Sequence, residues 1–210
     1  MKFKLFFTFV LIFLISIFFS SKAFAKTRIE EKADCQYEIK VKMVFDFKTP
    51  KAQDLADSLL AEWQNGMNQV WHAYKNEKCQ AKFIFTLDKI PGGKTCNDFP
   101  SAHCYQVVET DRNQRGNISD STLSVPNSNQ NSQGEWTIYT TGLNAAHEAG
   151  HMMGLGDEYH YKKINKQLFW VANYISKNGW QSIMAQTWDK ATSSQEQVLN
   201  VLKQAGYTKF

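Results

Sequence analysis

Apolar and polar residues alternate along residues 37–47, where Tyr, Ile, Val, Met and Phe fill every second position. Charged residues occupy most of the positions between them. A period of two places one face of an extended chain in the core and leaves the other in solvent. The same alternation returns at residues 81–87. The pattern therefore predicts two half-buried β-strands.

The segment between these two strands has a helical pattern instead. Thr49 suits the N-cap, and Pro50 suits the first helical position because the N–H it lacks would have no partner there. Apolar residues then recur at spacings of three and four as far as Tyr74. They predict a long helix of roughly seven turns. A strand–helix–strand order favours parallel neighbouring strands joined by a right-handed crossover.

Three further strands are expected in the middle of the chain. Residues 105–109 and 136–140 are predicted strands, whereas residues 112–134 are rich in Asn, Ser, Gln and Gly and are predicted mostly as loop. Within this loop, residues 122–126 are predicted as a short edge strand that ends at Pro126. The sequence therefore predicts five strands in all.

Two more helices are expected in the second half. The first covers residues 142–153 and has small residues on one face, which allow close packing against a sheet. The second begins at a capping box formed by Ser193 and Glu196 and ends at Gly206. Its predicted inward-facing residues are Val198, Leu199, Leu202 and Ala205.

The N-terminal segment differs in composition from the rest of the chain. Two lysines precede an apolar run at residues 6–19, and the small residues Ala23 and Ala25 fit a signal-peptidase site. We expect residues 1–25 to be a secretory signal peptide and residues 26–210 to be a single domain. The alternative is an uncleaved membrane anchor. The apolar segment at residues 6–19 is short for this role, because a helix needs about 20 apolar residues to span a bilayer.

The distribution of charge argues against two classes of partner. The chain has 24 basic and 20 acidic residues, and three of the lysines lie within residues 1–25. The remaining chain is therefore almost neutral. We expect no nucleic-acid partner and no stable membrane association after signal cleavage.

The four cysteines are Cys35, Cys79, Cys96 and Cys104. In an exported chain, an even number of cysteines indicates disulfide bonds. Cys35 and Cys79 directly precede the two strands that are predicted to be parallel neighbours, so both would lie at the same end of the sheet. We therefore predict the pair Cys35–Cys79 and, by elimination, the pair Cys96–Cys104.

The densest group of metal-binding side chains lies at residues 147–160, which read HEAGHMMGLGDEYH. On a helix, His147 and His151 share one face, and Glu148 lies beside them. Imidazoles one turn apart can bind one zinc ion, and the glutamate can accept a proton from a water that the metal activates. A short H-E-x-x-H match also arises by chance, so a third ligand and further context are needed.

The eleven residues HEAGHMMGLGD fit the pattern H-E-x-x-H-x-x-G-x-x-H/D, and the chain therefore resembles the metzincin zinc endopeptidases. In the snapalysin-like group of these enzymes the third ligand is aspartate, and the resemblance assigns this role to Asp157. Two alternatives remain. Glu158 would point the other way in an extended segment, and His160 has suitable chemistry at a different offset.

Ser182-Ile183-Met184 resembles the methionine turn that lies beneath the zinc ion in this clan, with Met184 as its methionine. The resemblance implies a metzincin-like fold of the α+β class: a twisted mixed five-stranded sheet, a long first helix, an active-site helix, the methionine turn and a C-terminal helix. Several metzincins have tyrosine two residues after this methionine, where the chain has Gln186. Tyr159 and Tyr161 are candidate replacements.

The resemblance implies a secreted or periplasmic zinc endopeptidase. Zn²⁺ would be held by His147, His151 and Asp157, and Glu148 would be the general base. We expect a monomer that takes a protein or peptide substrate, paired as an extended strand with the edge strand at residues 123–125. The alternatives are a non-catalytic exported binding protein with the same fold and a zinc amidase acting on cell-wall peptide. An intact Glu148 argues against the binding protein, because a structural zinc site needs no base.

Overall fold

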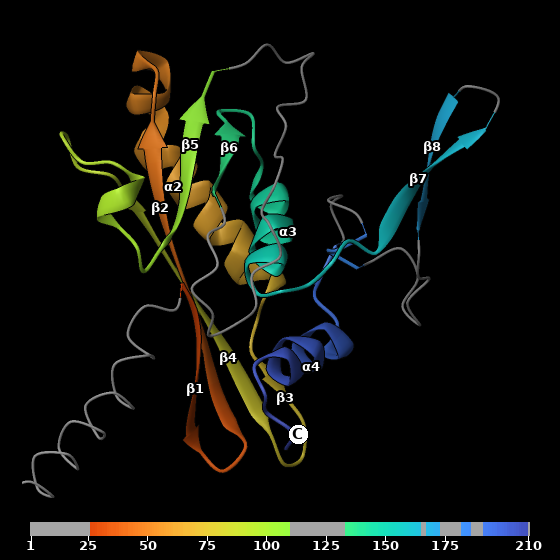
Figure 1. The fold of residues 1–210 in the computed structure, drawn as a ribbon. Coiled ribbons are helices and arrows are strands. Elements are labelled where there is room, and N and C mark those ends of the chain that lie inside the picture. Colours follow the sequence, from red (N-terminus) through yellow and green to blue (C-terminus); the bar gives the residue numbers. More distant parts are fainter. Residues whose placement is uncertain (1–25, 110–132, 165–166, 173–181, 186–190, 210) are drawn as a thin grey trace, which may run out of the picture.

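The computed structural model describes residues 26–109, 133–164, 167–172, 182–185 and 191–209. These residues form an α+β fold with a mixed six-stranded sheet, a separate two-stranded sheet and three α-helices. Helices α2 (Pro50–Val70) and α3 (Gly142–Met152) lie side by side next to the sheet (Figure 1). Within the described residues, no helix has the length and apolar character needed to cross a membrane.

Strand β2 (Gln36–Phe47) is the centre of the large sheet. It runs parallel to β4 (Gln80–Lys89) on one side and, along its second half, parallel to β5 (His103–Val108) on the other. Strand β6 (Gln133–Thr137) extends the sheet beyond β5, again in parallel. The predicted parallel pairing of the first two strands is therefore confirmed. The alternating residues of β2 that are 3% exposed or less are Tyr37, Ile39, Val41, Met43 and Phe45.

Two strands of this sheet are not predicted from the sequence. β1 (Thr27–Ala33) pairs antiparallel with the first half of β2, and the two-residue β3 (Tyr74–Lys75) pairs antiparallel with β4. Thr27 and Ile29 are the buried residues of β1, whereas most of its other residues are charged, so the apolar alternation is too short to predict a strand. Within the described residues, five strands follow one another as neighbours in the order β3-β4-β2-β5-β6, and β1 is a sixth strand that pairs with β2 beside this row. The predicted edge strand at residues 122–126 lies outside the described residues.

Helix α2 begins as predicted but ends earlier. Thr49 caps its first turn, and Pro50 is its first residue. The helix stops before Tyr74, its predicted end, and Tyr74 belongs to β3. Beyond the helix end, Trp71 turns its indole towards α3 and donates its Nε1 hydrogen to the Ala146 carbonyl oxygen at 2.7 Å. A tertiary contact to α3 therefore accompanies the earlier end of α2.

The predicted strand at residues 136–140 begins and ends three residues earlier, as β6. It ends where the Thr140 N–H donates to the Thr137 carbonyl oxygen at 3.0 Å and closes a turn. Trp63 of α2 holds this turn, because its Nε1 donates to the Thr140 carbonyl oxygen at 2.7 Å. Because α3 follows this turn directly, the contact with Trp63 sets where α3 begins.

Both predicted disulfides are present. Cys35 and Cys79 are bonded with their Cα atoms 4.7 Å apart, and Cys96 and Cys104 are bonded with their Cα atoms 5.6 Å apart. The first bond joins the starts of the parallel strands β2 and β4, as expected from the strand order. The second bond ties the short helix η1 (Cys96–Asp98) to β5.

Helix α4 (Gln195–Gln204) begins one residue later than the predicted capping box requires. The box consists of Ser194 and Gln197 and not of Ser193 and Glu196. The Ser193 hydroxyl donates instead to the Val70 carbonyl oxygen at 2.8 Å, which ties the start of α4 to the end of α2. Leu199 is only half-buried. The buried residues of α4 are Gln197, Val198, Val201 and Leu202.

A buried polar contact connects the N-terminal strand to the end of α3. The Thr27 hydroxyl donates to the Met152 carbonyl oxygen at 2.7 Å. Because its single hydrogen is used there, Thr27 accepts from His103 Nε2, which lies 2.9 Å from the Thr27 oxygen. Burial of His103, together with the charge of Lys26, lowers the pKa of His103 to about 3. His103 is therefore neutral in the folded protein at ordinary pH.

We expect His103 to make the fold sensitive to acid. An unfolded histidine takes up a proton near pH 6.5, whereas folded His103 stays neutral down to pH about 3. Within this window, the free energy of unfolding should fall by up to about 1.4 kcal/mol per pH unit as pH decreases. The variant His103→Gln keeps a side-chain N–H donor but does not titrate. Urea unfolding of both metal-free proteins at pH 7 and pH 4.5 should show a smaller loss in the variant. Equal losses would contradict this assignment.

Candidate metal centre

Helix α3 carries two of the predicted ligands and packs tightly against α2. Its N-terminus is capped by Thr141 and by Glu62 of α2, whose Oε1 accepts from the Gly142 N–H at 3.2 Å. The two helix backbones meet at Gly66 and Gly142, where a Cβ on Gly66 would lie 2.2 Å from the Gly142 carbonyl oxygen. The fully buried residues of the predicted small face are Ala145, Ala146 and Ala149.

The end of α3 turns the chain back towards its own histidines. The Gly154 N–H donates to the His151 carbonyl oxygen at 2.9 Å, and the Leu155 N–H donates to the Gly150 carbonyl oxygen at 3.0 Å. These two bonds form a Schellman motif. Gly154 has φ +92°, a conformation that glycine adopts without strain. The motif reverses the chain so that Asp157 faces α3.

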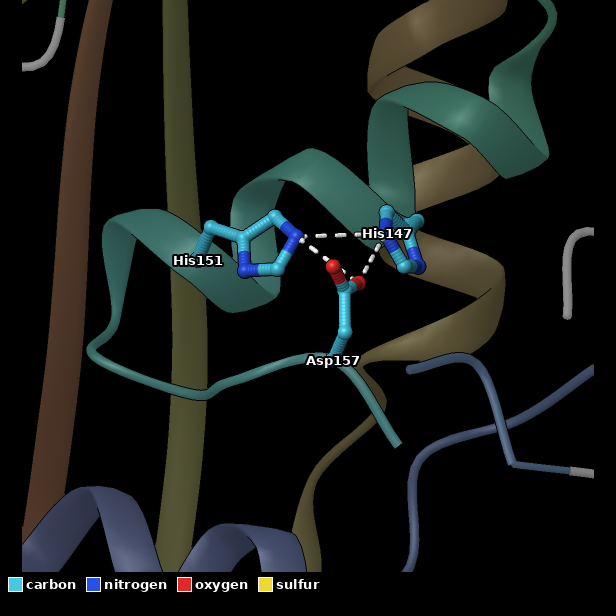
Figure 2. Close-up of side chains that lie close together, drawn as sticks. All are labelled: His147, His151 and Asp157. Atoms are coloured by element: carbon cyan, nitrogen blue, oxygen red, sulfur yellow. Dashed lines mark hydrogen bonds and ion pairs between the residues drawn. The ribbon is translucent and has the colours of Figure 1, made fainter. Parts of the chain in front are cut away.

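The structure brings His147, His151 and Asp157 together, as Figure 2 shows. Asp157 Oδ1 lies 3.2 Å from His147 Nε2 and 3.3 Å from His151 Nε2. The two Nε2 atoms are 3.2 Å apart. The two imidazoles are largely buried, whereas the Asp157 side chain is 40% exposed. The group is therefore open to solvent on the side of Asp157.

The outer ring nitrogens determine which atoms can bind a cation. His147 Nδ1 donates to the Ile183 carbonyl oxygen, and His151 Nδ1 donates to the Leu155 carbonyl oxygen, both at 2.8 Å. A carbonyl oxygen only accepts, so each Nδ1 carries a hydrogen and each neutral ring presents a bare Nε2 lone pair. Two lone pairs and a carboxylate oxygen then converge on one point. The two lone pairs and the carboxylate oxygen repel one another unless a cation or a proton lies among the three atoms.

The dimensions of this triangle fit a tetrahedral zinc ion. Bonds of about 2.0–2.1 Å to a tetrahedral ion place neighbouring ligand atoms about 3.3 Å apart. The three observed separations are 3.2, 3.2 and 3.3 Å. Two imidazole nitrogens and one carboxylate oxygen are also a donor set that zinc accepts, with a fourth position left for water or substrate. The residues present therefore fit the metal that the sequence predicts.

Charge at the site favours cation binding. Partial burial alone would raise the pKa of Asp157, but its close contacts with the His147 and His151 imidazoles hold that pKa well below its usual value. Burial alone would lower the pKa of His151, but the Asp157 hydrogen bond and the nearby Glu148 charge raise it. Two acidic groups, Asp157 and Glu148, thus lie close to the rings. A metal ion would take the place of the protons that this charge attracts.

Glu148 lies on α3 directly after the first histidine and is 6% exposed. A buried carboxylate is costly unless it has a partner or a task. Its charge reaches His151, as the raised pKa of that ring shows. Glu148 is thus a buried acidic group close to the candidate ligand His151.

The predicted methionine turn lies against α3. Met184 is fully buried, and its sulfur occupies the space beside Gly150, where a Cβ would lie 2.2 Å from that sulfur. Ile183 of the same turn accepts from the first histidine, His147. The turn therefore supports the middle of α3 and orients one ring. It also explains why the fourth residue of HEAGH is glycine.

The two alternative ligands have different positions. The Glu158 carboxylate accepts hydrogen bonds from Ser182 and Gln197 and is not part of the convergent group. His160 lies in β7 (Tyr159–Ile164), which pairs with β8 (Gln167–Ala172) in a hairpin that the sequence does not predict. The side chain of His160 lies outside the described part of the structure.

The candidate replacements for the missing tyrosine are only partly described. The Tyr159 ring centroid lies 6.2 Å from that of His147. The side chain of Tyr161 lies outside the described part of the structure, and so does Gln186. A tyrosine role at this site therefore stays a prediction.

Several supporting residues have no signal in the sequence. Glu62, Gln197 and the carbonyl oxygens of Ile183 and Leu155 are ordinary groups whose roles depend on the fold. Ser182 and Ile183 lie in a segment that does have a signal, the predicted methionine turn. No protein-family model matches the chain, and a search of curated proteins finds no match. The metzincin resemblance therefore rests on the HEAGHMMGLGD and Ser182-Ile183-Met184 segments of the sequence.

Proposed function

We propose that the protein is an exported zinc endopeptidase of the metzincin type. One observation carries the proposal: the Nε2 atoms of His147 and His151 and Oδ1 of Asp157 form a triangle with edges of 3.2–3.3 Å beside a buried Glu148. A purely structural zinc site usually has four protein ligands and no base. Three ligands with an adjacent carboxylate are typical of a hydrolytic zinc site.

The chain's own residues would divide the work. His147, His151 and Asp157 would hold Zn²⁺, which supplies Lewis acidity towards water and towards the carbonyl group of the substrate. Glu148 would accept the proton of the attacking water at its carboxylate and return it to the departing amine. The exposed side of Asp157 would leave access for an extended peptide. The predicted substrate-binding edge at residues 123–125 lies outside the described residues.

The cellular location is part of the proposal. Two disulfides favour an oxidising compartment, which agrees with a secreted or periplasmic protein. Residues 1–25, the predicted signal peptide, lie outside the described residues. A monomeric state and the absence of nucleic-acid partners stay predictions.

A cleavage assay tests the proposal. The mature chain should hydrolyse members of an unstructured peptide library, and a zinc chelator should abolish this activity. Added zinc should restore the activity, because removal of the metal leaves the disulfide-bonded fold intact. Mass spectrometry of the products locates the cleaved bonds.

The same assay separates the alternatives. A chain that binds zinc but cleaves no peptide would be a binding protein on this fold. A chain that cleaves only cell-wall peptides and leaves protein-derived peptides intact would be an amidase. Either result would contradict the endopeptidase.

A further inference from the structure

Asp157 lies on a connection that has little local support. Residues 155–157 have no regular structure, and glycine precedes Asp157 directly, at Gly156. Leu155 fixes the first part of this connection through the Schellman motif. Nothing lies within 4 Å of the place where a Cβ on Gly156 would be, so packing does not restrain that residue. The second part of the connection must therefore be held from elsewhere.

Glu158 supplies this second attachment. Its backbone N–H donates to the Met184 carbonyl oxygen at 3.0 Å. Its carboxylate accepts from the Ser182 hydroxyl through Oε2 and from Gln197 Nε2 through Oε1, the latter at 2.9 Å. Neighbouring residues in an extended segment point to opposite sides. Asp157 accordingly faces the histidines while Glu158 faces the methionine turn and α4.

Gln197 completes a closed network. Its amide nitrogen donates to both Glu158 and Ser182, in each case at 2.9 Å, and its amide oxygen accepts from the Ser194 N–H at 2.8 Å. All hydrogen-bonding atoms of this side chain are used, and Gln197 is 2% exposed. The reverse orientation of the amide would place its oxygen against the Glu158 carboxylate. The Gln197 amide can therefore donate to the Glu158 carboxylate in only one of its two orientations.

We propose that Glu158 and Gln197 are positioning residues for the third metal ligand, so that helix α4 is a functional part of the metal site. This inference rests on the metal site of the proposed function. The network acts at the residue next to Asp157, and a displacement of Glu158 moves the Asp157 carboxylate relative to both imidazoles. Groups that orient metal ligands typically contribute 10–100-fold to metal affinity.

The central test replaces the amide by a carboxylate. In Gln197→Glu, two carboxylates would face each other across the contact that now measures 2.9 Å. Repulsion should push Glu158 away and carry Asp157 out of position. We expect zinc affinity of the mature chain to fall by about 10–100-fold, measured by competition with a chromophoric chelator.

A reciprocal exchange distinguishes positioning from a general defect. The double variant Glu158→Gln/Gln197→Glu restores an amide opposite a carboxylate with the roles reversed. It should regain most of the lost zinc affinity, although Ser182 can donate to only one of the two new acceptors. Glu158→Gln alone should lose less than about tenfold, because its amide oxygen can still accept from Gln197.

The control is Gln195→Glu, which makes the same chemical change at an exposed position in the first turn of α4. Its zinc affinity should equal that of the wild type. Melting temperatures with and without zinc are recorded for every variant. A double variant that regains its melting temperature but not its zinc affinity would overturn the inference, since the network would then serve the fold alone.

The remaining outcomes are equally decisive. If the wild type binds no zinc, the metal site of the proposed function fails first. If the wild type binds zinc and Gln197→Glu binds it equally tightly, only the positioning role is wrong. If Gln197→Glu does not fold, Ser182→Ala decides, because it removes one donor to Glu158 with little change in volume. Reduced zinc affinity in that variant supports the inference, and unchanged affinity overturns it.

Discussion

Glu148→Gln is expected to lower peptide hydrolysis by at least about 100-fold, the usual contribution of a positioned general base. Glutamine has nearly the same shape, so the buried site beside His147 should keep its packing. It cannot accept the proton of the attacking water, and catalysis should therefore fall while zinc binding persists. The measurement is the rate of cleavage of one library peptide, together with the zinc content of the purified variant.

A matched control makes the same glutamate-to-glutamine substitution at a solvent-exposed position. Glu77 is exposed in the turn between β3 and β4. Glu77→Gln should cleave the peptide at the wild-type rate. Full activity of Glu148→Gln would show that another group takes the proton and that the proposed mechanism is wrong. Loss of both activity and zinc would instead give Glu148 a structural role.

Asp157→Ala is expected to weaken zinc binding by more than about 100-fold. Loss of a residue that only orients a metal ligand typically costs about 10–100-fold in affinity, and loss of the ligand itself should cost more. The substitution removes one of three convergent ligand atoms and the only one that carries a negative charge. The bare Nε2 atoms of His147 and His151, 3.2 Å apart, would remain without the carboxylate that balances a cation. Metal analysis and chelator competition measure the loss.

Two further variants define the ligand position. Asp157→His should restore part of the zinc binding, because histidine is the residue most metzincins have at this offset. His160→Ala should retain wild-type zinc affinity. If His160→Ala loses zinc and Asp157→Ala keeps it, the assignment of the third ligand fails, and the spacing argument for the metzincin resemblance fails with it.

Local patterns predicted the parts of the fold that depend on neighbours in the chain. The alternation at residues 37–47 and 81–87 and the helix between them indicated a parallel pair, which the register of β2 and β4 confirms. The two disulfides followed from that pairing and are also present. These inferences succeeded because a strand–helix–strand unit has few ways to fold and the cysteines directly precede its strands.

The errors lie where distant contacts select among local options. Ser193 and Ser194 are both good helix caps, and the hydrogen bond from Ser193 to the carbonyl oxygen of Val70 leaves Ser194 as the cap. Most of β1 is polar, so its apolar alternation was too short to predict a strand, and the antiparallel pairing with the first half of β2 defines it. The hairpin of β7 and β8 was missed for a similar reason: strand pairing, which composition does not reveal, defines it.

The sequence alone determined the composition of the candidate metal centre. His147 and His151 share one helical face with Glu148 beside them, and Gly154 ends that helix in a turn that brings Asp157 back, all within eleven residues. Such local geometry follows from helical periodicity and from the positive φ of one glycine. Only the tertiary structure decided how these groups are held. Ile183 orients a histidine, Met184 fills the space beside Gly150, and Gln197 holds Glu158. Hydrogen bonds and contacts across more than thirty residues of chain leave no periodic signal, because they depend on where the helices and turns pack and not on the spacing between them.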